Sequence, residues 1–529
     1  MSQGSVQKSE REVTKSINPA TGEILGETPV QSVAELKQFI QKAREAQKEW
    51  QIYSVKQRAK FLRPTREYLV EHAAEIAEII SRDNGKVRVD ALIGDVINAI
   101  ISMNYYCKHA NKFLKDKILR PGNILMINKY SKIVRVPFGV VGIISPWNYP
   151  FGIPFHEIIM GLLAGNAIIF KTATETQMVG KAIKRAMERA HLPEGLFAYV
   201  NMPGRIAGDA FLENGIDKLF FTGSVPVGKY LMRKASETLT PLSLELGGND
   251  PLIVCEDADP HRAASGTLWA GFTNAGQTCG GVERVYVHKN IYDEYMAILK
   301  EKIENFRVGY DTDFNVDMGA MTTTFQIDVV KMHVEDALKK GATIFAQSRM
   351  PDDPKWHNFL PAMVLSDVNH DMLLMQEETF GPVVGVMKVN DMDEAIRLAN
   401  DSMMGLTASV WSRNSKKAEK IARQIQAGAV TINDHLMSHG MAETPWGGFK
   451  QSGIGRTHGE LGLHEMTEPQ VIVHDRLFLA KKSLWWHPYS KQLYDGLLGA
   501  VDFLYAKSFS KRLKRLFKVI KLLPRIFEK

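Results

Sequence analysis

Residues 218–228 read KLFFTGSVPVG, in which a short apolar run leads into a Gly-Ser turn and a proline. The run Lys218–Thr222 predicts a buried strand, and Pro226 suits the first turn of a helix, where its missing N–H is not needed. The free N–H groups at such a helix N-terminus, next to Gly223 and Ser224, favour binding of a pyrophosphate. A purely structural turn is the alternative, because this segment is neither a G-x-G-x-x-G motif nor a P-loop.

The alternation of apolar strands and amphipathic helices extends outward from this unit, from about residue 16 to residue 475. It predicts an α/β protein with parallel sheets, because consecutive parallel strands need helical crossovers. Past residue 474 an aromatic stretch at 484–489 precedes a basic tail. We expect strands at Val140–Ile144, Ala167–Lys171, 251–254, Val383–Val389, 133–136 and 471–473, and helices at 33–53, 56–84 and 156–163.

Composition excludes several classes of protein. The chain has 529 residues, of which 45% are apolar and 24% charged, so that wholesale disorder, collagen and coiled-coil fibres are excluded. The cysteines Cys107, Cys255 and Cys279 form neither a disulfide framework nor a metal-ligand spacing, and predict a reducing compartment and no metal. Residues 1–15 lack the apolar core of a secretory signal, and no apolar run reaches about 18 residues. We therefore expect a cytoplasmic protein.

The basic charge is confined to the tail. The formal net charge is +7, but residues 505–529 contain nine basic residues and one acid. The rest of the chain is thus nearly neutral, whereas a nucleic-acid-binding body would carry a basic face of its own. The charge distribution predicts no nucleic-acid partner.

Cys279 is the candidate nucleophile. Residues 272–284 read FTNAGQTCGGVER, and the glycines around the cysteine allow a ligand to approach the backbone closely. The Cys279 N–H is then free to bind an oxyanion. A free thiol has a pKa of about 8.5 and needs a neighbouring base or a positive field to become a thiolate. A small buried hydrophobic residue is the alternative explanation.

Two polar residues suit the same chemistry. Glu245 ends an apolar run before two glycines, and burial there should raise its pKa toward that of a general base. Asn148 lies in the sequence PWNYP, where two prolines stiffen the loop and the amide is positioned to donate to an oxyanion. An ion-paired structural glutamate and an ordinary turn are the respective alternatives.

Lys171 is a further candidate for cofactor binding. It ends the expected strand Ala167–Lys171, and open α/β sheets bind ligands at the carboxyl ends of their strands. The lysine would then contact ribose hydroxyls or a phosphate. A solvated surface lysine is the alternative.

Six windows, in order, resemble the aldehyde dehydrogenase superfamily over residues 16–475. They are the sequences at 146–150 (PWNYP), 221–224 (FTGS), 245–248 (ELGG), 276–279 (GQTC), 378–382 (ETFGP) and 445–448 (PWGG). The resemblance implies an aldehyde dehydrogenase fold with three parts. We expect a Rossmann-like cofactor domain at 16–120 and 140–248, an α/β catalytic domain at 249–443, and a small β oligomerisation arm at 121–139 and 444–475. The tail occupies 476–529.

The resemblance also implies residue roles. Cys279 would be the nucleophile, Glu245 the general base, and Asn148 part of the oxyanion hole. The cofactor would be NAD or NADP, and the protein a homodimer or homotetramer. The cofactor-binding residues would be Ser145, Pro146, Trp147, Lys171, Thr174, Gly223, Ser224, Gly228, Leu246, Gly247, Glu378 and Phe380.

These roles imply oxidation of an aldehyde to the free acid through a cysteine thiohemiacetal and a thioester. Relatives that pass the acyl group to coenzyme A can lack an acid at position 245, so Glu245 favours hydrolysis. A non-enzymatic relative that keeps the scaffold is the rival interpretation, but it has no need of Cys279, Glu245 and Asn148 together.

One departure concerns the cofactor. Members that prefer NAD commonly read Lys-Pro-Ser-Glu after the strand, whereas this chain reads Lys-Thr-Ala-Thr at 171–174. A neutral Thr174 lifts the repulsion that a glutamate there would exert on a 2′-phosphate. NADP use is therefore open, although Glu175 follows directly and is able to take over that repulsion.

The resemblance places Tyr149, His156, Thr278 and Trp446 along the aldehyde tunnel, with the loop at 435–444. Aromatic side chains favour an apolar or aromatic aldehyde of medium or long chain. No arginine pair stands in these windows to bind a second carboxylate, which disfavours succinic semialdehyde as the alternative substrate.

The tail predicts membrane contact. Apolar residues at 509, 513, 516, 520, 523 and 527 are offset by two from basic residues at 507, 511, 514, 518, 521 and 525, which puts the two sets on opposite helix faces. Pro524 should kink the end. With aromatics upstream, residues 484–529 resemble a helix lying on an anionic membrane, as some fatty-aldehyde members of the superfamily have. We expect peripheral attachment to the cytosolic face; packing on the protein body or on a partner subunit is the alternative.

Overall fold

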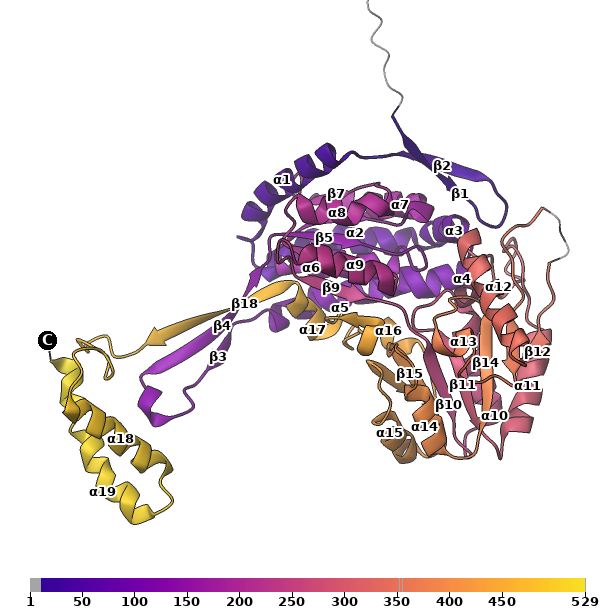
Figure 1. Cartoon of the computed structure of the whole chain (residues 1–529). Coiled ribbons are helices and arrows are strands. Elements are labelled where there is room, and N and C mark those ends of the chain that lie inside the picture. The colour runs from indigo at the N-terminus through magenta and orange to yellow at the C-terminus, as the bar shows by residue number, and fades with distance from the viewer. Residues whose placement is uncertain (1–10, 352, 354, 529) are drawn as a thin grey trace, which may run out of the picture. The chain divides into compact units, whose positions relative to one another are not determined.

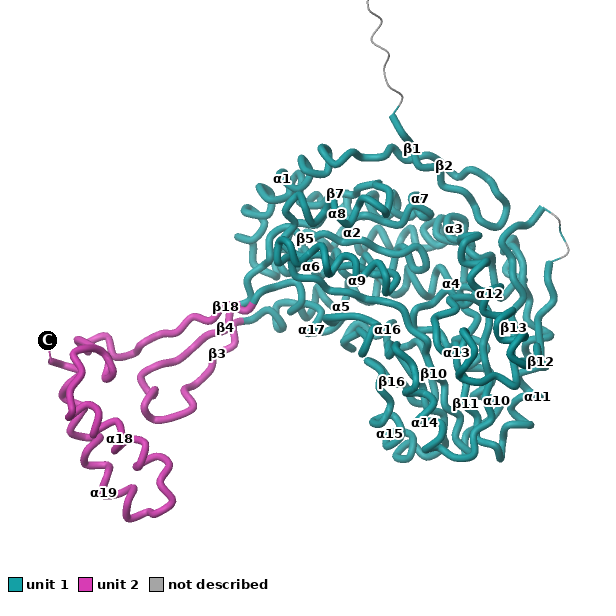
Figure 2. The backbone as a smooth tube through the Cα atoms, in the orientation of Figure 1, with its two compact units in different colours: residues 1–115, 135–468 teal, residues 116–134, 469–529 magenta. Residues whose placement is uncertain are grey.

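The computed structural model describes residues 11–351, 353 and 355–528. The polar residues 1–10 and the last basic residue of the tail, Lys529, lie outside these ranges. The described residues form two compact units, one reaching Lys115 and resuming from Arg135 to Glu468, the other containing Asp116–Val134 and the chain from Pro469 onward (Figure 2).

A six-stranded sheet in the first unit carries the expected strand–turn–helix. Its order is β17-β9-β8-β5-β6-β7, and all neighbours except β17 and β9 are parallel. Because β6 and β8 flank β5 on opposite sides, the chain reverses its direction of travel at β5, and ligands bind at such a switch point. The strands are β5 (Val140–Ile144), β6 (Ala167–Lys171), β7 (Phe197–Tyr199), β8 (Lys218–Thr222), β9 (Leu242–Glu245) and β17 (Gly453–Ile454) (Figure 1).

One helix expected beside this sheet differs in the structure. The expected helix at 56–84 is two helices, α2 and α3, because His72 leaves the helical conformation (φ −105°, ψ 18°) and its ring contacts Glu75. The other elements are β1 (Val13–Ile17), β2 (Ile24–Pro29), α1 (Val33–Trp50), α2 (Val55–Glu71), α3 (Ala73–Asn84), α4 (Arg88–Asp90), η1 (Ala91–Ile97), α5 (Asn98–Phe113), α6 (Gly152–Ala164), η3 (Thr174–Thr176), α7 (Gln177–Glu188), α8 (Gly204–Glu213) and α9 (Val225–Ala235).

A seven-stranded sheet forms the rest of the first unit, in the order β12-β13-β14-β11-β10-β15-β16, with only β12 antiparallel to its neighbour. Its strands are β10 (Asp250–Val254), β11 (Val282–His288), β12 (Thr343–Gln347), β13 (Met363–Ser366), β14 (Val383–Val389), β15 (Thr407–Trp411) and β16 (Ala429–Ile432). Its helices are α10 (Pro260–Phe272), η4 (Thr273–Gly276), α11 (Tyr292–Glu304), α12 (Thr324–Lys339), α13 (Leu373–Gln376), α14 (Met392–Asn400), α15 (Ser415–Ala422), α16 (Met437–Gly440), η5 (Lys450–Ser452) and α17 (Gly459–Glu465).

Each large sheet has its own apolar core. One cluster of buried side chains surrounds β5, β6 and β8, and a second surrounds β10, β11 and β14. All residues of β5, β6 and β10 are buried, as expected for parallel strands that helices cover on both faces. These two rigid layers hold the loops that follow their strands.

The second unit contains a small sheet and a helical hairpin. The sheet has the order β18-β4-β3, and its strands β4 and β18 include the expected strands at 133–136 and 471–473. Among the described residues, no helix combines the length and the apolar character needed to cross a bilayer. The elements are β3 (Lys117–Leu119), η2 (Ile124–Met126), β4 (Lys129–Pro137), β18 (Thr467–Asp475), α18 (Lys491–Tyr505), α19 (Phe509–Ile520) and η6 (Leu523–Phe527).

The tail does not form the single helix with a kink at Pro524 that the sequence predicts. The α-helix α19 ends at Ile520, and Pro524 lies in the separate short helix η6. The expected roles of the domains and of the β arm stay predictions.

Candidate active site

Loops at the carboxyl ends of β5, β8 and β9 meet the loop before β11 at Cys279. Asn148 follows β5, Gly223 follows β8 and Glu245 ends β9, where it pairs with Thr222. Cys279 lines three cavities at once: a cleft of about 1170 Å³, an apolar tunnel of about 910 Å³ and a small chamber of about 380 Å³. A group on its sulfur is therefore accessible from three sides.

The loop that presents Cys279 is held in an unusual backbone conformation. Asn274 and Ala275 have φ of 53° and 55°, a left-handed region that side chains seldom adopt. Gly276 also has a positive φ, and a Cβ there would lie 2.1 Å from the carbonyl oxygen of Gly381, so only glycine fits. The carboxylate of Asp90 stabilises this turn, because it accepts hydrogen bonds from the Asn274 N–H (2.8 Å) and from the hydroxyl of the preceding threonine (2.9 Å).

The described side chains around Cys279 do not supply the positive charge that would favour a thiolate. Burial raises the pKa of its thiol, and the carboxyl groups of Glu378, Asp250 and Glu245 raise it further. The described residues that line its three cavities include no lysine or arginine. Of the two aids that a thiol needs, the described lining offers a carboxyl group, Glu245, as a candidate base, but no lysine or arginine side chain.

Asn148 is positioned by a buried network. Its Nδ2 donates to the carbonyl oxygen of Gln277 (3.1 Å), two residues before Cys279, and its buried Oδ1 has no protein partner. Its own carbonyl oxygen accepts from Lys86 Nζ (2.6 Å), which also donates to Asp95 (2.9 Å). Lys86 and Asp95 form a fully buried ion pair. Sequence reasoning missed this pair, because its only sign in the sequence is a lysine and an aspartate nine residues apart in an apolar stretch.

Glu245 is buried and lines both the large cleft and the small chamber. Burial raises its pKa well above the usual value, and the neighbouring carboxyl group of Glu157 raises it further. Its Oε2 has no protein partner. A carboxylate whose affinity for a proton is raised in this way suits a general base.

The large cleft has the features of a dinucleotide site. Ser224 caps α9 without a side-chain hydrogen bond, which leaves the first N–H groups of the helix free for a phosphate. A Cβ on Gly247 would lie 2.2 Å from Glu378 Oε2, so the glycine leaves room for that carboxylate, which accepts from the Gly248 N–H (2.9 Å). The rings of Trp147 and Phe380 meet edge to face at 5.5 Å. The expected cofactor residues that line this cleft are Pro146, Trp147, Gly223, Ser224, Leu246, Gly247, Glu378 and Phe380.

Four expected cofactor residues do not line the cleft. Ser145 is buried and Gly228 packs under Leu246, where a Cβ would come within 2.7 Å. Lys171 is buried rather than solvated, and burial lowers its pKa to about 8. Thr174 begins the short helix η3, and the next residue, Glu175, lines the cleft in its place.

The tunnel is mostly apolar, although Asp90, Asn98, Thr273 and His439 also line it. Three of the expected residues line it: Tyr149, Thr278 and Trp446, and the Tyr149 and Thr278 hydroxyls are 2.9 Å apart. The fourth, His156, is instead fully buried beside Glu245 in the small chamber, because its Nε2–H donates to Asn98 Oδ1 (3.1 Å). The tunnel walls that sequence reasoning missed come from η1, α5 and α10: Ile93, Ile97, Ile101 and Trp269.

A model of the aldehyde dehydrogenase family matches residues 6–472. The chain belongs to the aldehyde dehydrogenase family. It is 38% identical over 491 residues to a 4,4′-diapolycopene aldehyde oxidase of Methylomonas, covering 93% of this chain and 91% of that protein. It is 36% identical to a putative NADP-dependent succinate-semialdehyde dehydrogenase of Mycobacterium ulcerans, covering 87% and 88%.

Solved structures of aldehyde dehydrogenases have the same fold. An aldehyde dehydrogenase of Brucella melitensis biovar abortus superposes with a TM-score of 0.82 and 32% identity, covering 88% of this chain and 94% of that one. Betaine aldehyde dehydrogenase of Staphylococcus aureus, solved in complex with NAD⁺, superposes with a TM-score of 0.84 and 29% identity, covering 90% and 94%. The expected fold is confirmed, and the protein is an NAD- or NADP-dependent aldehyde dehydrogenase.

Among the described residues of this aldehyde dehydrogenase, no three His, Cys, Asp or Glu side chains are placed together to hold a metal ion. The residues around Cys279 fit the dinucleotide instead. The free N–H groups at α9 suit its phosphates, and the Glu378 carboxylate beside Gly247 suits ribose hydroxyls.

Proposed function

We propose that this aldehyde dehydrogenase oxidises medium- or long-chain apolar aldehydes to carboxylic acids through a thioester on Cys279. The observation that carries the proposal is the position of Cys279, where the apolar tunnel, the dinucleotide cleft and the Glu245 chamber adjoin. Substrate, hydride acceptor and hydrolytic water then reach one sulfur atom by separate routes.

The first half of the reaction uses Cys279 and Asn148. Glu245 takes the proton of the thiol, and the sulfur adds to the aldehyde carbonyl to give a thiohemiacetal oxyanion. The Asn148 amide and the Cys279 N–H donate to that oxyanion, and one such donor is typically worth about 3 kcal/mol. Bound NAD(P)⁺ supplies a hydride acceptor and a positively charged ring. Loss of hydride from the thiohemiacetal leaves the thioester.

The second half uses Glu245 again. After the thiol proton has left it for solvent, Glu245 is a carboxylate again and removes a proton from water. The water oxygen adds to the thioester carbonyl, the carbon–sulfur bond breaks, the sulfur takes up a proton, and the acid is released. General-base assistance of this kind contributes about 10²- to 10⁴-fold. The side chain reaches both halves of the reaction because it lines the cleft and the chamber.

The character of the tunnel supports the substrate class. Ile93, Ile97 and Ile101 recur every fourth residue along η1 and α5, line the tunnel and remain 40–50% exposed. An apolar stripe that continues from a pocket to the surface suits a chain too long to be enclosed. The relative named as a 4,4′-diapolycopene aldehyde oxidase is compatible with such a substrate.

A series of straight-chain aldehydes from about two to about sixteen carbons, assayed with NAD and with NADP, tests the substrate class. We expect kcat/KM to rise with chain length, because each buried CH₂ group contributes about 0.8 kcal/mol. Ile97→Asp should flatten this rise, whereas Ile52→Asp, at an exposed isoleucine outside the tunnel, should leave it unchanged. A preference for the shortest aldehydes contradicts the proposal.

Succinic semialdehyde is the second candidate, because several relatives carry that name. Its distal carboxylate needs a cation, and no lysine or arginine is found among the described residues that line the tunnel. In the same assay we expect its kcat/KM to fall far below that of decanal. The reverse order would select this candidate instead.

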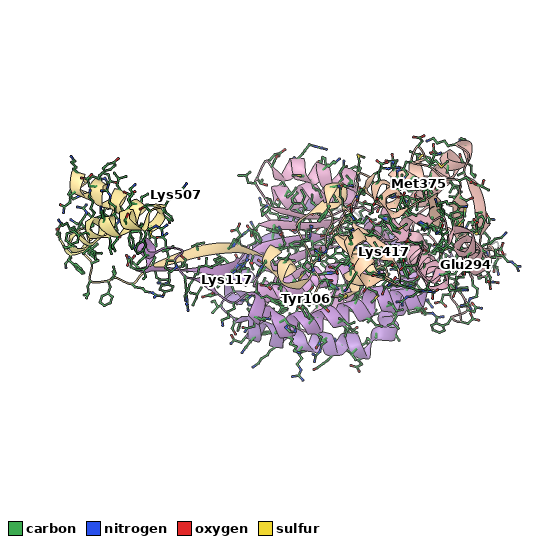
Figure 3. The ribbon with its side chains drawn as sticks, turned by 90° about the horizontal axis from the view of Figure 1, so that it is seen from below. Tyr106, Lys117, Glu294, Met375, Lys417 and Lys507 are labelled. Atoms are coloured by element: carbon green, nitrogen blue, oxygen red, sulfur yellow. The ribbon has the colours of Figure 1, made fainter. Side chains whose placement is uncertain are left out.

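We also propose that the tail attaches the enzyme to an anionic membrane. Helices α18 and α19 form a hairpin that turns near Lys507 (Figure 3), and Asp502 pairs with Lys511 (2.7 Å) and Arg515 (3.1 Å). The basic side of α19 thus packs partly on α18, as Leu522 does on Gly496. The opposite side stays exposed, with apolar rows from both helices: Tyr494, Leu498, Val501, Tyr505, Phe509, Leu513 and Phe517.

Apolar rows flanked by basic groups suit the interface of an anionic bilayer. Flotation of the full chain with vesicles of phosphatidylcholine, with and without phosphatidylserine, tests this. We expect binding that requires phosphatidylserine and is lost in the double variant Leu513→Asp, Phe517→Asp, but kept in Leu239→Asp, which alters an exposed leucine of the first unit. If the double variant loses a dimer but floats as the parent does, these apolar rows contact a partner subunit instead of the membrane.

A further inference from the structure

The side chain of Asn274 bridges the loop that carries Asn148 and the loop that carries Cys279. Asn274 is buried and lies five residues before Cys279. Its Nδ2 donates to the carbonyl oxygen of Asn148 (3.0 Å) and to that of Gln277 (3.1 Å). The first carbonyl belongs to the loop after β5, and the second belongs to the loop before β11. These two loops supply the two oxyanion donors of the proposed reaction.

The hydrogen-bond partners fix how the two asparagine amides are oriented. Both partners of the Asn274 amide are carbonyl oxygens, which only accept, so its nitrogen must face them. The same holds for Asn148, whose Nδ2 donates to the Gln277 carbonyl oxygen (3.1 Å). This bond uses one of the two amide protons of Asn148. The other proton is free for an oxyanion in the cleft that Asn148 and Cys279 line together.

The two carbonyl oxygens in this network each accept two hydrogen bonds. That of Asn148 accepts from Asn274 Nδ2 and from Lys86 Nζ (2.6 Å). That of Gln277 accepts from the side-chain amides of Asn274 and Asn148. A carbonyl oxygen has two lone pairs, so both oxygens are saturated. A shift of either loop would break some of these buried bonds, and the cost of unmade buried bonds opposes the shift.

The backbone of Asn274 is held as firmly as its amide. Its φ of 53° and ψ of 34° are left-handed, a conformation that asparagine and glycine adopt more readily than other residues. Its N–H donates to Asp90 (2.8 Å), and its carbonyl oxygen accepts from Gln277 Nε2 (3.0 Å) and from the Gln277 N–H (3.1 Å). The side chain therefore projects from a fixed point between the two loops.

The anchors of this bridge come from one short segment of the chain. Asp90 holds the Asn274 N–H, and Asp95 pairs with Lys86 (2.9 Å), which holds the Asn148 carbonyl oxygen. The residues after Asp90 form η1, a π-helix, in which hydrogen bonds span five residues. Residues five apart therefore lie close together along its axis, and this segment reaches both loops.

We propose that Asn274 is a positioning residue that sets the geometry of the oxyanion hole, because it fixes the Asn148 amide relative to the Cys279 N–H. Asn274 lines none of the three cavities at Cys279, so it acts through Asn148 and not through contact with the substrate. The proposal rests on the roles given to Asn148 and Cys279 under the proposed function.

The bridge bears on rate more than on binding. A donor stabilises an oxyanion only when it already points to the place that the oxygen will occupy in the transition state. Without Asn274, the loop of Asn148 keeps its bond to Lys86 but loses its link to the Cys279 loop. We therefore expect slower formation of the thioester, with little change in KM for the aldehyde.

The first test uses Asn274→Gly, which removes the bridge and keeps the backbone unstrained, because glycine adopts positive φ freely. It needs no dinucleotide. The ester 4-nitrophenyl hexanoate acylates the sulfur of Cys279 through an oxyanion; the carbon–sulfur bond forms, 4-nitrophenolate leaves, and the thiol proton passes to Glu245. Iodoacetamide alkylates the same sulfur without an oxyanion.

We expect Asn274→Gly to slow acylation about tenfold and to leave alkylation at the rate of the parent. Absorbance of 4-nitrophenolate measures acylation, and mass spectrometry of the Cys279 peptide measures alkylation. Unchanged acylation overturns the proposal. Equal slowing of both reactions also overturns it, because the variant would then have disturbed the sulfur itself and not the oxyanion hole.

The second test asks whether Asn274 acts through Asn148. Rapid mixing with decanal and the preferred dinucleotide gives a burst of reduced cofactor, whose rate constant reports thioester formation. We expect the double variant Asn274→Gly, Asn148→Ala to be no slower than Asn148→Ala alone, because residues that act as one unit are not additive. A further tenfold slowing overturns the proposal. Absence of a burst in the parent contradicts the proposed function instead, and the ester assay then decides on Asn274 by itself.

Asn358→Gly is the matched control. It makes the same change at another left-handed asparagine (φ 60°), outside the three cavities, and should keep all three rates of the parent. Equal slowing in this control overturns the assignment to the bridge. Quenching of tryptophan fluorescence by the dinucleotide should be the same in Asn274→Gly and in the parent. Weaker binding would place the effect in the whole cleft and overturn a role confined to the oxyanion hole.

Discussion

At the residue scale, the proposed function assigns hydrolysis of the thioester to Glu245. We expect Glu245→Gln to give a burst of reduced cofactor of about one equivalent per active site, followed by a steady rate lower by about 10²- to 10⁴-fold, because the amide cannot take a proton from water. Stopped-flow absorbance of the reduced nicotinamide measures both phases. If the steady rate is unchanged, Glu245 is not the base.

Cys279→Ser is the companion variant. A serine hydroxyl is far less acidic than a thiol, so we expect neither burst nor steady rate with this variant. Circular dichroism and the melting temperature check that both variants are folded. A retained burst would exclude Cys279 as the nucleophile.

Glu175 bears on the choice of cofactor. Its carboxylate lines the dinucleotide cleft, whereas Thr174 does not. A 2′-phosphate near that carboxylate is repelled by an amount that depends on how well water screens the pair. We expect Glu175→Ala to raise the ratio of kcat/KM for NADP over NAD by about tenfold, with Glu188→Ala, outside the cleft, as the control. An unchanged ratio would show that Glu175 does not contribute to selection.

At the scale of elements, one carboxylate of β11 holds the loop that carries Glu378 and Phe380. Glu283 is buried, accepts from the Thr379 N–H (2.9 Å) and the Phe380 N–H (2.8 Å), and also pairs with Asn249. These bonds support Phe380 in its left-handed conformation (φ 51°). These bonds fix the loop of Glu378 and Phe380, which lines the large cleft, to the sheet.

We expect Glu283→Ala to weaken dinucleotide binding and to lower stability, because two buried N–H groups lose their partner at about 1–3 kcal/mol each. Quenching of tryptophan fluorescence by the dinucleotide measures binding, and denaturant unfolding measures stability. If stability falls but dinucleotide binding is unchanged, Glu283 has only a structural role.

The sequence predicted elements best where apolar runs end in turn residues. β5, β6, β8 and β14 have the expected bounds, because each is a short buried strand bounded by polar or glycine residues. The break at His72 was missed, since the helical pattern continues through it. His156 was expected in the tunnel but lines the small chamber, because a motif gives its position along α6 but not its hydrogen bond to Asn98.

At the scale of the whole molecule, the small sheet of the second unit leaves an apolar strand uncovered. β18 ends the order β18-β4-β3, and its Val471 and Val473 are each 59% exposed. Unpaired, apolar edge strands invite pairing with another chain. This supports the expected role of the arm in oligomers.

We expect Val471→Lys combined with Val473→Lys to shift the protein toward the monomer without changing its secondary structure. Light scattering after size-exclusion chromatography measures the mass, and circular dichroism is the control. Substitution of Val70 by lysine, at an exposed valine of α2, should leave the mass unchanged. An unaltered mass in the double variant would remove β18 from the interface.

The sequence placed the basic charge in the tail, but it did not predict how the tail uses that charge. The spacing of residues 507–525 predicts a helix with apolar and basic faces, and α19 is a helix over Phe509–Ile520 of this segment. It did not predict that Asp502 of α18 would pair with Lys511 and Arg515, because contact between two helices depends on the turn that joins them. The same limit applies to Lys86 and Asp95, whose pairing depends on the path of α3 and η1.

The surroundings of Cys279 disfavour its thiolate, because burial and the neighbouring carboxyl groups raise the pKa of the thiol. Peroxides and alkylating agents attack thiolates much faster than thiols. We therefore expect hydrogen peroxide to inactivate the free enzyme slowly, and faster once oxidised dinucleotide is bound. Oxidative stress should then inactivate working copies first and leave a reserve of idle ones.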